Sequence, residues 1–261
     1  MGILNVTADS FYDGGRYGAF DLAVERAVQM IEEGADVIDV GGESTRPGSL
    51  PIPAQQEIDR VVPVIEALRG DFSTAISIDT TKATVAREAL AAGASVINDV
   101  SALRFDADMP ALIAKSGAFV VLMHMLGTPG TMQKNPVYED AVAAIRSFLA
   151  ERIAAANEAG IPADRIIIDP GIGFGKTLAH NLAILRDVHR FAELGPPVLI
   201  GLSRKSFLGA MIDAAADERL AGTIAANAVA VRNGADILRV HDVKEGRQAA
   251  AVAMRLRTND A

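Results

Sequence analysis

The sequence predicts an α/β protein that folds as a single (β/α)8 TIM barrel over residues 1–261. Short apolar runs alternate eight times with segments of helical periodicity. Several of these segments end at a glycine and lead directly into the next apolar run, as at Gly34, Gly93 and Gly234. Glycine at such a position adopts the left-handed conformation that ends a helix. Since no linker or change in composition marks a second domain, eight units in this length fit one barrel, with a doubly wound open sheet as the alternative.

The predicted strands are short. In Arg165–Ile168 apolar residues follow one another without alternation, which is typical of a parallel strand that is covered on both faces. In chain order the predicted strands are Ile3–Val6, Asp36–Val40, Ala75–Ile78, Ser95–Asn98, Phe119–Met123, Arg165–Ile168, Val198–Leu202 and Ile237–Val240.

The predicted helices have apolar residues three and four positions apart, so one face of each is expected to be buried. In the longest, Tyr138–Ala159, Val142, Ile145 and Leu149 belong to this face. The other helices are expected at Asp21–Glu33, Ala54–Leu68, Lys82–Ala92, Met109–Lys115 and Leu178–Leu194, in segments between Leu202 and Arg232, and from Val243 onward.

Composition narrows the class of partner. Half of the residues are hydrophobic, which is enough for a large core, and the formal net charge is −8. This negative charge argues against nucleic acid or an anionic membrane as the main partner. The chain has no cysteine, which excludes disulfides, thiolate metal sites and cysteine nucleophiles. No signal peptide is visible and no apolar run approaches about 18 residues, so we expect a cytoplasmic protein that acts on small molecules.

Polar side chains follow nearly every predicted strand. The carboxyl ends of the strands in a barrel meet at one rim, where barrel enzymes have their active sites. The residues expected there are Asn5, Asp39, Asp79, Asn98, Asp99, His124, Asp169, Ser203, Arg204, Lys205, Arg239 and His241. We interpret His124 as structural, because it follows an apolar run. A whole ring of polar groups indicates a ligand, since buried polar groups are costly unless they are matched.

The ring divides into two kinds of chemistry. Asp79, Asn98, Asp169 and Lys205 combine acceptors and donors, which suits a flat heterocycle with both kinds of edge. A carboxylate can accept two parallel N–H bonds from an amino-pyrimidinone, as it does from guanidinium. The other group offers donors and positive charge for an anion such as phosphate, and consists of Asn5, Arg46, Arg239 and His241.

The run DPGIGFGKT, from Asp169 to Thr177, contains a misleading motif. Its end resembles a phosphate-binding P-loop, which requires a glycine five residues before the last one. Pro170 occupies that position, so we reject nucleotide binding through this loop. Instead, a carboxylate at the end of a buried strand, followed by glycines that permit close approach of the backbone, predicts the floor of a binding pocket.

Eight motifs in order give the chain a resemblance to the dihydropteroate synthases over nearly its whole length. They are GILNVTADSF from Gly2, DVGGESTRPG from Asp39, SIDT from Ser77, INDVS from Ile97, LMHMLGTP from Leu122, DPGIGFGKT from Asp169, SRKSFLG from Ser203 and RVHD from Arg239. The resemblance implies one pterin-binding barrel domain. It also implies a transferase of folate biosynthesis that joins 6-hydroxymethyl-7,8-dihydropterin diphosphate to 4-aminobenzoate with Mg²⁺ and releases pyrophosphate.

The resemblance also implies roles for single residues. The pterin-binding positions match Asp79, Asn98, Asp169 and Lys205, and the Mg²⁺ contact matches Asn5. The diphosphate-binding positions match Asn5, Thr45, Arg46, Arg239 and His241. The aminobenzoate-binding positions match Thr45, Pro47, Phe174, Lys205 and Ser206. Members are commonly dimers, so we expect a homodimer.

Some positions depart from the family pattern, and other functions stay open. Ala8 stands where members often have proline, Ala102 replaces a usual glycine and Leu126 a usual glutamine. None of these is a predicted ligand contact, so they bear on the loops more than on activity. The alternatives are a sulfonamide-tolerant synthase, a non-catalytic pterin-binding paralogue and a methyltetrahydrofolate-binding methyltransferase. The anion set that includes Arg239 and His241 favours the synthase over the methyltransferase.

Overall fold

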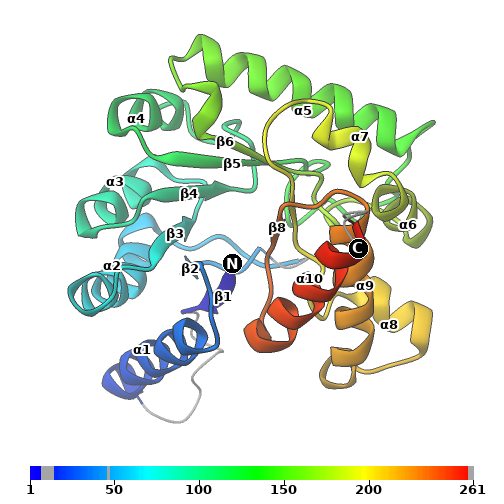
Figure 1. Cartoon of the computed structure of the whole chain (residues 1–261). Helices are drawn as coiled ribbons and strands as arrows, with labels where there is room; N and C mark the ends of the chain where they lie inside the picture. The colour runs from blue at the N-terminus through cyan, green and yellow to red at the C-terminus, as the bar shows by residue number, and fades with distance from the viewer. Residues whose placement is uncertain (7–14, 46–47, 258–261) are drawn as a thin grey trace.

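The protein forms a ring of parallel strands with helices outside it, as a computed structural model shows (Figure 1). The structure describes residues 1–6, 15–45 and 48–257. Six strands form one parallel sheet in chain order: β1 (Gly2–Asn5), β2 (Val37–Gly41), β3 (Ala75–Asp79), β4 (Val96–Asp99), β5 (Phe119–Met123) and β6 (Ile166–Asp169). The two remaining named strands, β7 (Leu199–Ile200) and β8 (Ile237–Leu238), pair with each other.

Two parallel bridges close these sheets into a barrel. One joins Ile168 to Val198 and the other joins Gly2 to Val240. The second junction is reinforced by a hydrogen bond of 2.9 Å from the Ile3 amide to the Val240 carbonyl. The predicted barrel is therefore confirmed, and the open-sheet alternative is wrong.

The helices cover the outside of the barrel. They are α1 (Gly15–Glu32), α2 (Ala54–Asp71), α3 (Ala83–Ala92), α4 (Met109–Ser116), α5 (Ala141–Glu158), α6 (Leu178–Arg186), α7 (Val188–Ala192), α8 (Ser206–Ile212), α9 (Leu220–Arg232) and α10 (Val243–Arg257), with 3₁₀ turns at Ala163–Arg165 and Ala216–Glu218. The glycines expected to end helices do so, because Gly34, Gly93 and Gly234 have φ of 94°, 118° and 120°. No helix in the described part of the chain is long and apolar enough to cross a membrane.

Two predicted helix boundaries are wrong because of particular hydrogen bonds. Tyr138 lies before its helix, because Asp140 caps α5 by accepting a hydrogen bond of 3.0 Å from the Ala143 amide. The helix predicted over Leu178–Leu194 is split at Asp187 into α6 and α7. At this break the Leu185 carbonyl accepts a hydrogen bond of 2.7 Å from the side chain of Asn233. A helix that continued would use that carbonyl within its own ladder.

The core has an inner and an outer part. The outer part lies between strands and helices and includes Val120 and Leu122 of β5. Val121, between them in sequence, belongs instead to a small separate cluster with Val96 and Leu199. Since successive side chains of a strand point to opposite faces, this small cluster fills the barrel interior. It forms the apolar layer beneath the rim.

Candidate functional site

The polar layer of the site lies directly above this apolar layer. Asn98 is two residues beyond Val96 on β4, and Asp169 is two residues beyond Ile167, which packs against the same inner cluster. Asp79 stands beside Asn98 in the register of β3 and β4. Side-chain alternation therefore directs these three residues into the barrel at the carboxyl end of the strands.

Asp39 connects the residues of this layer. Its Oδ2 accepts a hydrogen bond of 3.0 Å from the Asn98 amide and another of 2.6 Å from Arg239 Nε. The Nη2 atom of Arg239 donates a further hydrogen bond of 2.7 Å to Asp79 Oδ2. Two residues predicted to bind pterin are thus brought together with one predicted to bind diphosphate. The sequence placed Asp39 at the rim but did not indicate that it links the two groups.

Each of these carboxylates keeps one oxygen available. The Oδ1 atoms of Asp39 and Asp79 are buried and have no hydrogen-bond partner among the described residues. A buried acceptor without a partner is costly, and a ligand N–H group would relieve that cost.

The charges of this cluster affect one another. Burial raises the pKa of Asp79 from 3.8 to about 7, although the Arg239 guanidinium opposes the shift. Burial alone would lower the pKa of Arg239, but Asp39 and Asp79 outweigh it and the pKa is raised. Arg239 is therefore a permanent cation shared by two carboxyl groups.

Asp169 and Lys205 form the opposite wall. Asp169 Oδ1 accepts a hydrogen bond of 2.7 Å from the Gly171 amide, and burial raises the pKa of this carboxyl. The ammonium of Lys205 donates to the Ile172 carbonyl and lies 4.8 Å from the centre of the Phe174 ring. Burial lowers the pKa of Lys205 to about 8, against the attraction of Asp169. Phe174 and Lys205 are therefore in contact, as expected for one pocket.

The other predicted anion-binding residues lie on neighbouring strands. Asn5 ends β1, and a Cβ built on Gly41 would lie 3.9 Å from both Asn5 Oδ1 and Asp79 Oδ2. Asn5 and Asp79 thus both border Gly41, which has no side chain. His241 follows β8, and its Nδ1 is 3.0 Å from Ser203 Oγ.

Two further predicted residues, Ser206 and Thr45, are more exposed than the residues of the polar layer. Ser206 is exposed at the start of α8, and Thr45 is half-buried after β2. Arg46 and Pro47, as well as Ala8, lie outside the described residues. Their predicted roles are not tested by the structure.

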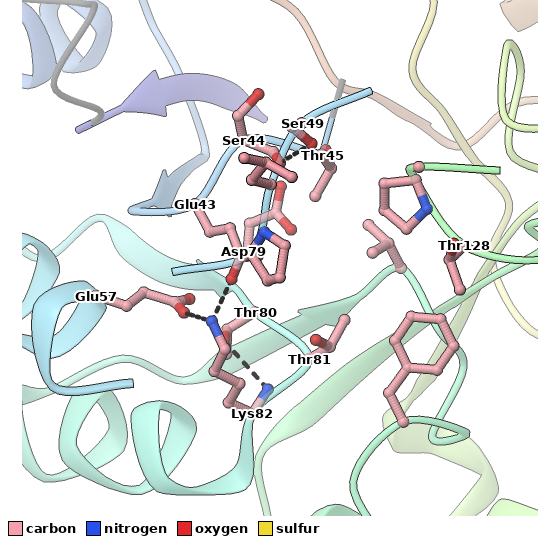
Figure 2. A pocket seen from close by; sticks show the side chains of 16 residues that line it. Glu43, Ser44, Thr45, Ser49, Glu57, Asp79, Thr80, Thr81, Lys82 and Thr128 are labelled. Carbon is pink, nitrogen blue, oxygen red and sulfur yellow. Dashed lines mark hydrogen bonds and ion pairs between the residues drawn. The ribbon is translucent and has the colours of Figure 1, made fainter. Parts of the chain in front are cut away.

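A cavity of about 420 Å³ lies beside the polar layer (Figure 2). Its described lining includes Asp79 and Thr45 but not Asn98, Asp169 or Lys205. At one end, Lys82 donates hydrogen bonds to Glu43 and, at 2.6 Å, to Glu57, as the dashed lines in Figure 2 show. The sequence did not predict this ion-pair cluster, because it indicated only that Lys82 begins a helix. No cluster of three or more His, Cys, Asp or Glu side chains that could hold a metal occurs in residues 1–6, 15–45 and 48–257.

The chain is similar to a well-defined group of proteins. Residues 1–241 match the sequence model of the family described as pterin binding enzyme. The dihydropteroate synthase of Escherichia coli (strain K12) is 46% identical over 245 residues, which cover 94% of this chain and 86% of that relative. The structure of the Yersinia pestis dihydropteroate synthase with a sulfonamide drug complex has a TM-score of 0.93 and 44% identity, covering 98% of this chain and 93% of that chain. The Xanthomonas albilineans dihydropteroate synthase in complex with 7,8-dihydropteroate has a TM-score of 0.89 and 44% identity, covering 99% and 93%.

Proposed function

This chain belongs to the pterin-binding enzymes and, within them, to the dihydropteroate synthases, and on that premise we propose how its residues carry the reaction. The reaction condenses 6-hydroxymethyl-7,8-dihydropterin diphosphate with 4-aminobenzoate to give 7,8-dihydropteroate and pyrophosphate. It is a transferase reaction on small-molecule substrates.

The polar layer around Asp39 is the observation that carries the assignment of the pterin site. Asp79, Asn98, Asp169 and Lys205 bind the pterin ring. Support comes from the buried Asp79 Oδ1, which has no partner among the described residues, and from the mixture of acceptors and donors on this layer. The N–H edge of an aminopterin supplies the donors that these carboxylates lack.

The diphosphate lies beside the pterin layer, on the side of Arg239, and is bound by Asn5, Thr45, Arg46, Arg239 and His241. The bond between the pterin methylene carbon and the diphosphate oxygen breaks, and its electron pair leaves with pyrophosphate. Arg239 and His241 stabilise the charge that develops on that oxygen. The support for this role is that Arg239 keeps its charge beside two carboxylates. The amine nitrogen of 4-aminobenzoate then attacks the methylene cation and releases its proton.

The aminobenzoate ring occupies a pocket formed by Thr45, Pro47, Phe174, Lys205 and Ser206. The contact between the Lys205 ammonium and the Phe174 ring supports this assignment. A positive side chain over an aromatic wall suits a ligand that combines a benzene ring with a carboxylate.

Magnesium fits the anion end as part of a substrate complex. Mg²⁺ is usually held by one or two protein oxygens together with substrate phosphates and water, rather than by a full protein cage. The amide oxygen of Asn5, which borders the carboxylate layer, provides such a single ligand. When bound, the ion would neutralise charge on the diphosphate and make it a better leaving group.

A direct assay tests the proposal. Purified protein should release pyrophosphate only when both the pterin diphosphate and 4-aminobenzoate are present. Release with the pterin diphosphate alone would indicate a hydrolase. Binding of pterin without any release in the presence of both substrates would indicate the non-catalytic paralogue.

A further inference from the structure

Lys176 is a buried lysine that is not among the residues proposed to bind a substrate. It belongs to the GFGKT run, where a P-loop lysine would face a phosphate. Here the residue is only 3% exposed. A lysine is rarely buried to this extent without several hydrogen-bond partners.

Three acceptors surround the Lys176 nitrogen. His124 Nδ1 and the Phe174 carbonyl are each 2.9 Å away, and the His124 carbonyl is 3.3 Å away. An ammonium group uses its three protons on these three acceptors. Burial lowers the pKa of Lys176, and a neutral amine would also fit, since it can donate to both carbonyls and accept from His124 Nδ1–H. The contacts are therefore satisfied in either protonation state.

The loop that carries Phe174 is held almost entirely by side chains. Four successive carbonyls accept hydrogen bonds, from Lys205 at Ile172, from Gln133 at Gly173 (3.1 Å), from Lys176 at Phe174 (2.9 Å) and from Tyr138 at Gly175 (3.0 Å). Among the described residues, Lys176 is the one of the four donors that has a further hydrogen bond inside the core, to His124. Because a hydrogen bond inside the protein is stronger than one that competes with water, we expect this donor to contribute strongly to the position of the Phe174 carbonyl.

His124 is fixed in turn by its own surroundings. Its ring packs edge-on against Phe148 with the ring centroids 4.9 Å apart. It is the first residue after β5, and its amide donates a hydrogen bond of 2.9 Å to the Asp169 carbonyl. The acceptor for Lys176 therefore belongs to the barrel wall rather than to a loop.

We propose that Lys176 and His124 form an internal anchor that positions Phe174 and thereby shapes the aminobenzoate pocket. Both act as positioning residues. The Phe174 ring also packs against a small apolar cluster that includes Met123 and Met125, which steadies the ring but does not fix the carbonyl behind it. The inference rests on the proposed role of Phe174 in binding aminobenzoate.

The test separates the two substrates. Lys176→Met keeps the length of the side chain but removes its hydrogen bonds. We expect the KM for 4-aminobenzoate to rise by about tenfold or more, a loss of roughly 1.4 kcal/mol. The KM for the pterin diphosphate should stay within about twofold, because Asp79 and Asn98 lie on other strands. Asp169 and Lys205 contact the loop at Gly171 and Ile172, which Lys176 does not bind.

Two variants of His124 provide matched controls. His124→Asn keeps an acceptor oxygen where Nδ1 stands, so its aminobenzoate KM should stay close to that of the unaltered protein. His124→Leu fills similar space without an acceptor and should reproduce the effect of Lys176→Met. This pair also tests the anchor if Lys176→Met does not fold.

Other outcomes would overturn the proposal. A folded Lys176→Met protein with an unchanged aminobenzoate KM would show that the anchor does not position the pocket. A selective loss of pterin diphosphate binding would assign Lys176 to phosphate after all. Phe174→Ala separates the role of Phe174 in the pocket from the role of the anchor that positions it. If it leaves the aminobenzoate KM unchanged, the assigned pocket is wrong, whereas an effect there but not in Lys176→Met rejects the anchor alone.

Discussion

Arg239 is a single cation that is shared between two acidic side chains. Arg239 lies within 2.7 Å of both Asp39 and Asp79, so its single positive charge offsets two carboxyl groups. Removing one partner of such a buried group leaves an uncompensated charge and is far more costly than the pair is stabilising. Arg239→Ala would therefore disturb the pterin layer as well as the diphosphate end. Variants that keep the shape of the side chain are better probes.

Asp169→Asn tests the pterin floor with little change of shape. In the unaltered protein the backbone N–H of Gly171 donates a hydrogen bond of 2.7 Å to Asp169 Oδ1. The side-chain oxygen of the asparagine can accept the same hydrogen bond. The amide nitrogen then replaces the other carboxylate oxygen, so a donor faces the donors of the pterin. We expect affinity for a pterin ligand to fall by ~2–4 kcal/mol, with an unaltered circular dichroism spectrum. Titration calorimetry measures the loss, and unaltered pterin affinity would remove Asp169 from the site.

Asp79 should give the protein a measurable dependence of stability on pH. Its pKa is about 7 in the folded protein against 3.8 as reference, so between these values the folded state keeps a proton that the unfolded state has lost. Rising pH therefore favours unfolding, by up to ~1.4 kcal/mol per pH unit for one group, and the loss is complete above the folded pKa.

Asp79→Asn removes this contribution. The variant should gain in thermal midpoint relative to the unaltered protein as pH rises from about 4.5 to 7.5. Other buried acids with raised pKa, such as Asp99 and Asp169, are present in both proteins and cancel in the difference. Parallel midpoint curves over this range would contradict the assigned titration of Asp79.

In the loop after β6, every second residue from Gly171 to Gly175 is a glycine for a conformational reason. Gly171, Gly173 and Gly175 all have positive φ, between 67° and 82°. A Cβ on Gly171 would lie 2.0 Å from the His124 carbonyl oxygen, and one on Gly175 would lie 2.5 Å from the Leu126 side chain. The loop therefore lies directly on the segment that follows β5. Phe174 lies between these glycines and contacts Lys205.

Gly171→Ala and Gly117→Ala form a matched pair that separates conformation from contact. Gly171 and Gly117 have nearly the same φ, 70° and 69°, but a Cβ on Gly117 would meet nothing within 4 Å. Gly117→Ala should cost only the left-handed conformation, ~1–2 kcal/mol of unfolding free energy. Gly171→Ala adds a clash with backbone and should cost ~3 kcal/mol or more. Urea unfolding of both variants measures the difference, and equal losses would mean that the loop relaxes away from His124.

Local sequence signals recovered the elements better than their ends. Apolar runs and glycine stops placed all eight strands and the helices between them. The break at Asp187 was not predictable, because it depends on Asn233, which is 48 residues away from Leu185. Likewise, Tyr138 continues the apolar pattern of α5, but its hydroxyl donates to Gly175 instead. Such boundaries are decided by tertiary hydrogen bonds that periodicity does not contain.

The topology of the complete barrel made the residues of the candidate site predictable. Parallel strands bring their carboxyl ends to one rim, so Asp79, Asn98 and Asp169 could be grouped from position alone. The links between them could not be foreseen, since no pattern indicates that Asp39 accepts from both Asn98 and Arg239. The role of Lys176 was also hidden, because a motif describes spacing and not the direction of a side chain.

The outer surface of the barrel carries an apolar area on two neighbouring helices. Val229 on α9 and Val252 and Leu256 on α10 are 49%, 60% and 64% exposed. The helices are joined at one end by a hydrogen bond of 3.0 Å from Arg232 to the Leu256 carbonyl. Val229 lies about one helical turn before Arg232, and Val252 lies about one turn before Leu256. Exposed apolar side chains on neighbouring helices are typical of a protein interface, so we expect the homodimer predicted from the family resemblance to pair through this area.

Val229→Glu combined with Val252→Glu tests this interface. In a two-fold dimer each substitution occurs twice, and each would bury a carboxylate without a partner, at a cost of several kcal/mol. We expect light scattering after size-exclusion chromatography to give the mass of two chains for the unaltered protein and of one chain for the double variant. Val137→Glu is the control, since Val137 is 72% exposed but precedes α5 on another part of the barrel. A monomeric unaltered protein, or a double variant that remains dimeric, would show that α9 and α10 do not form the interface.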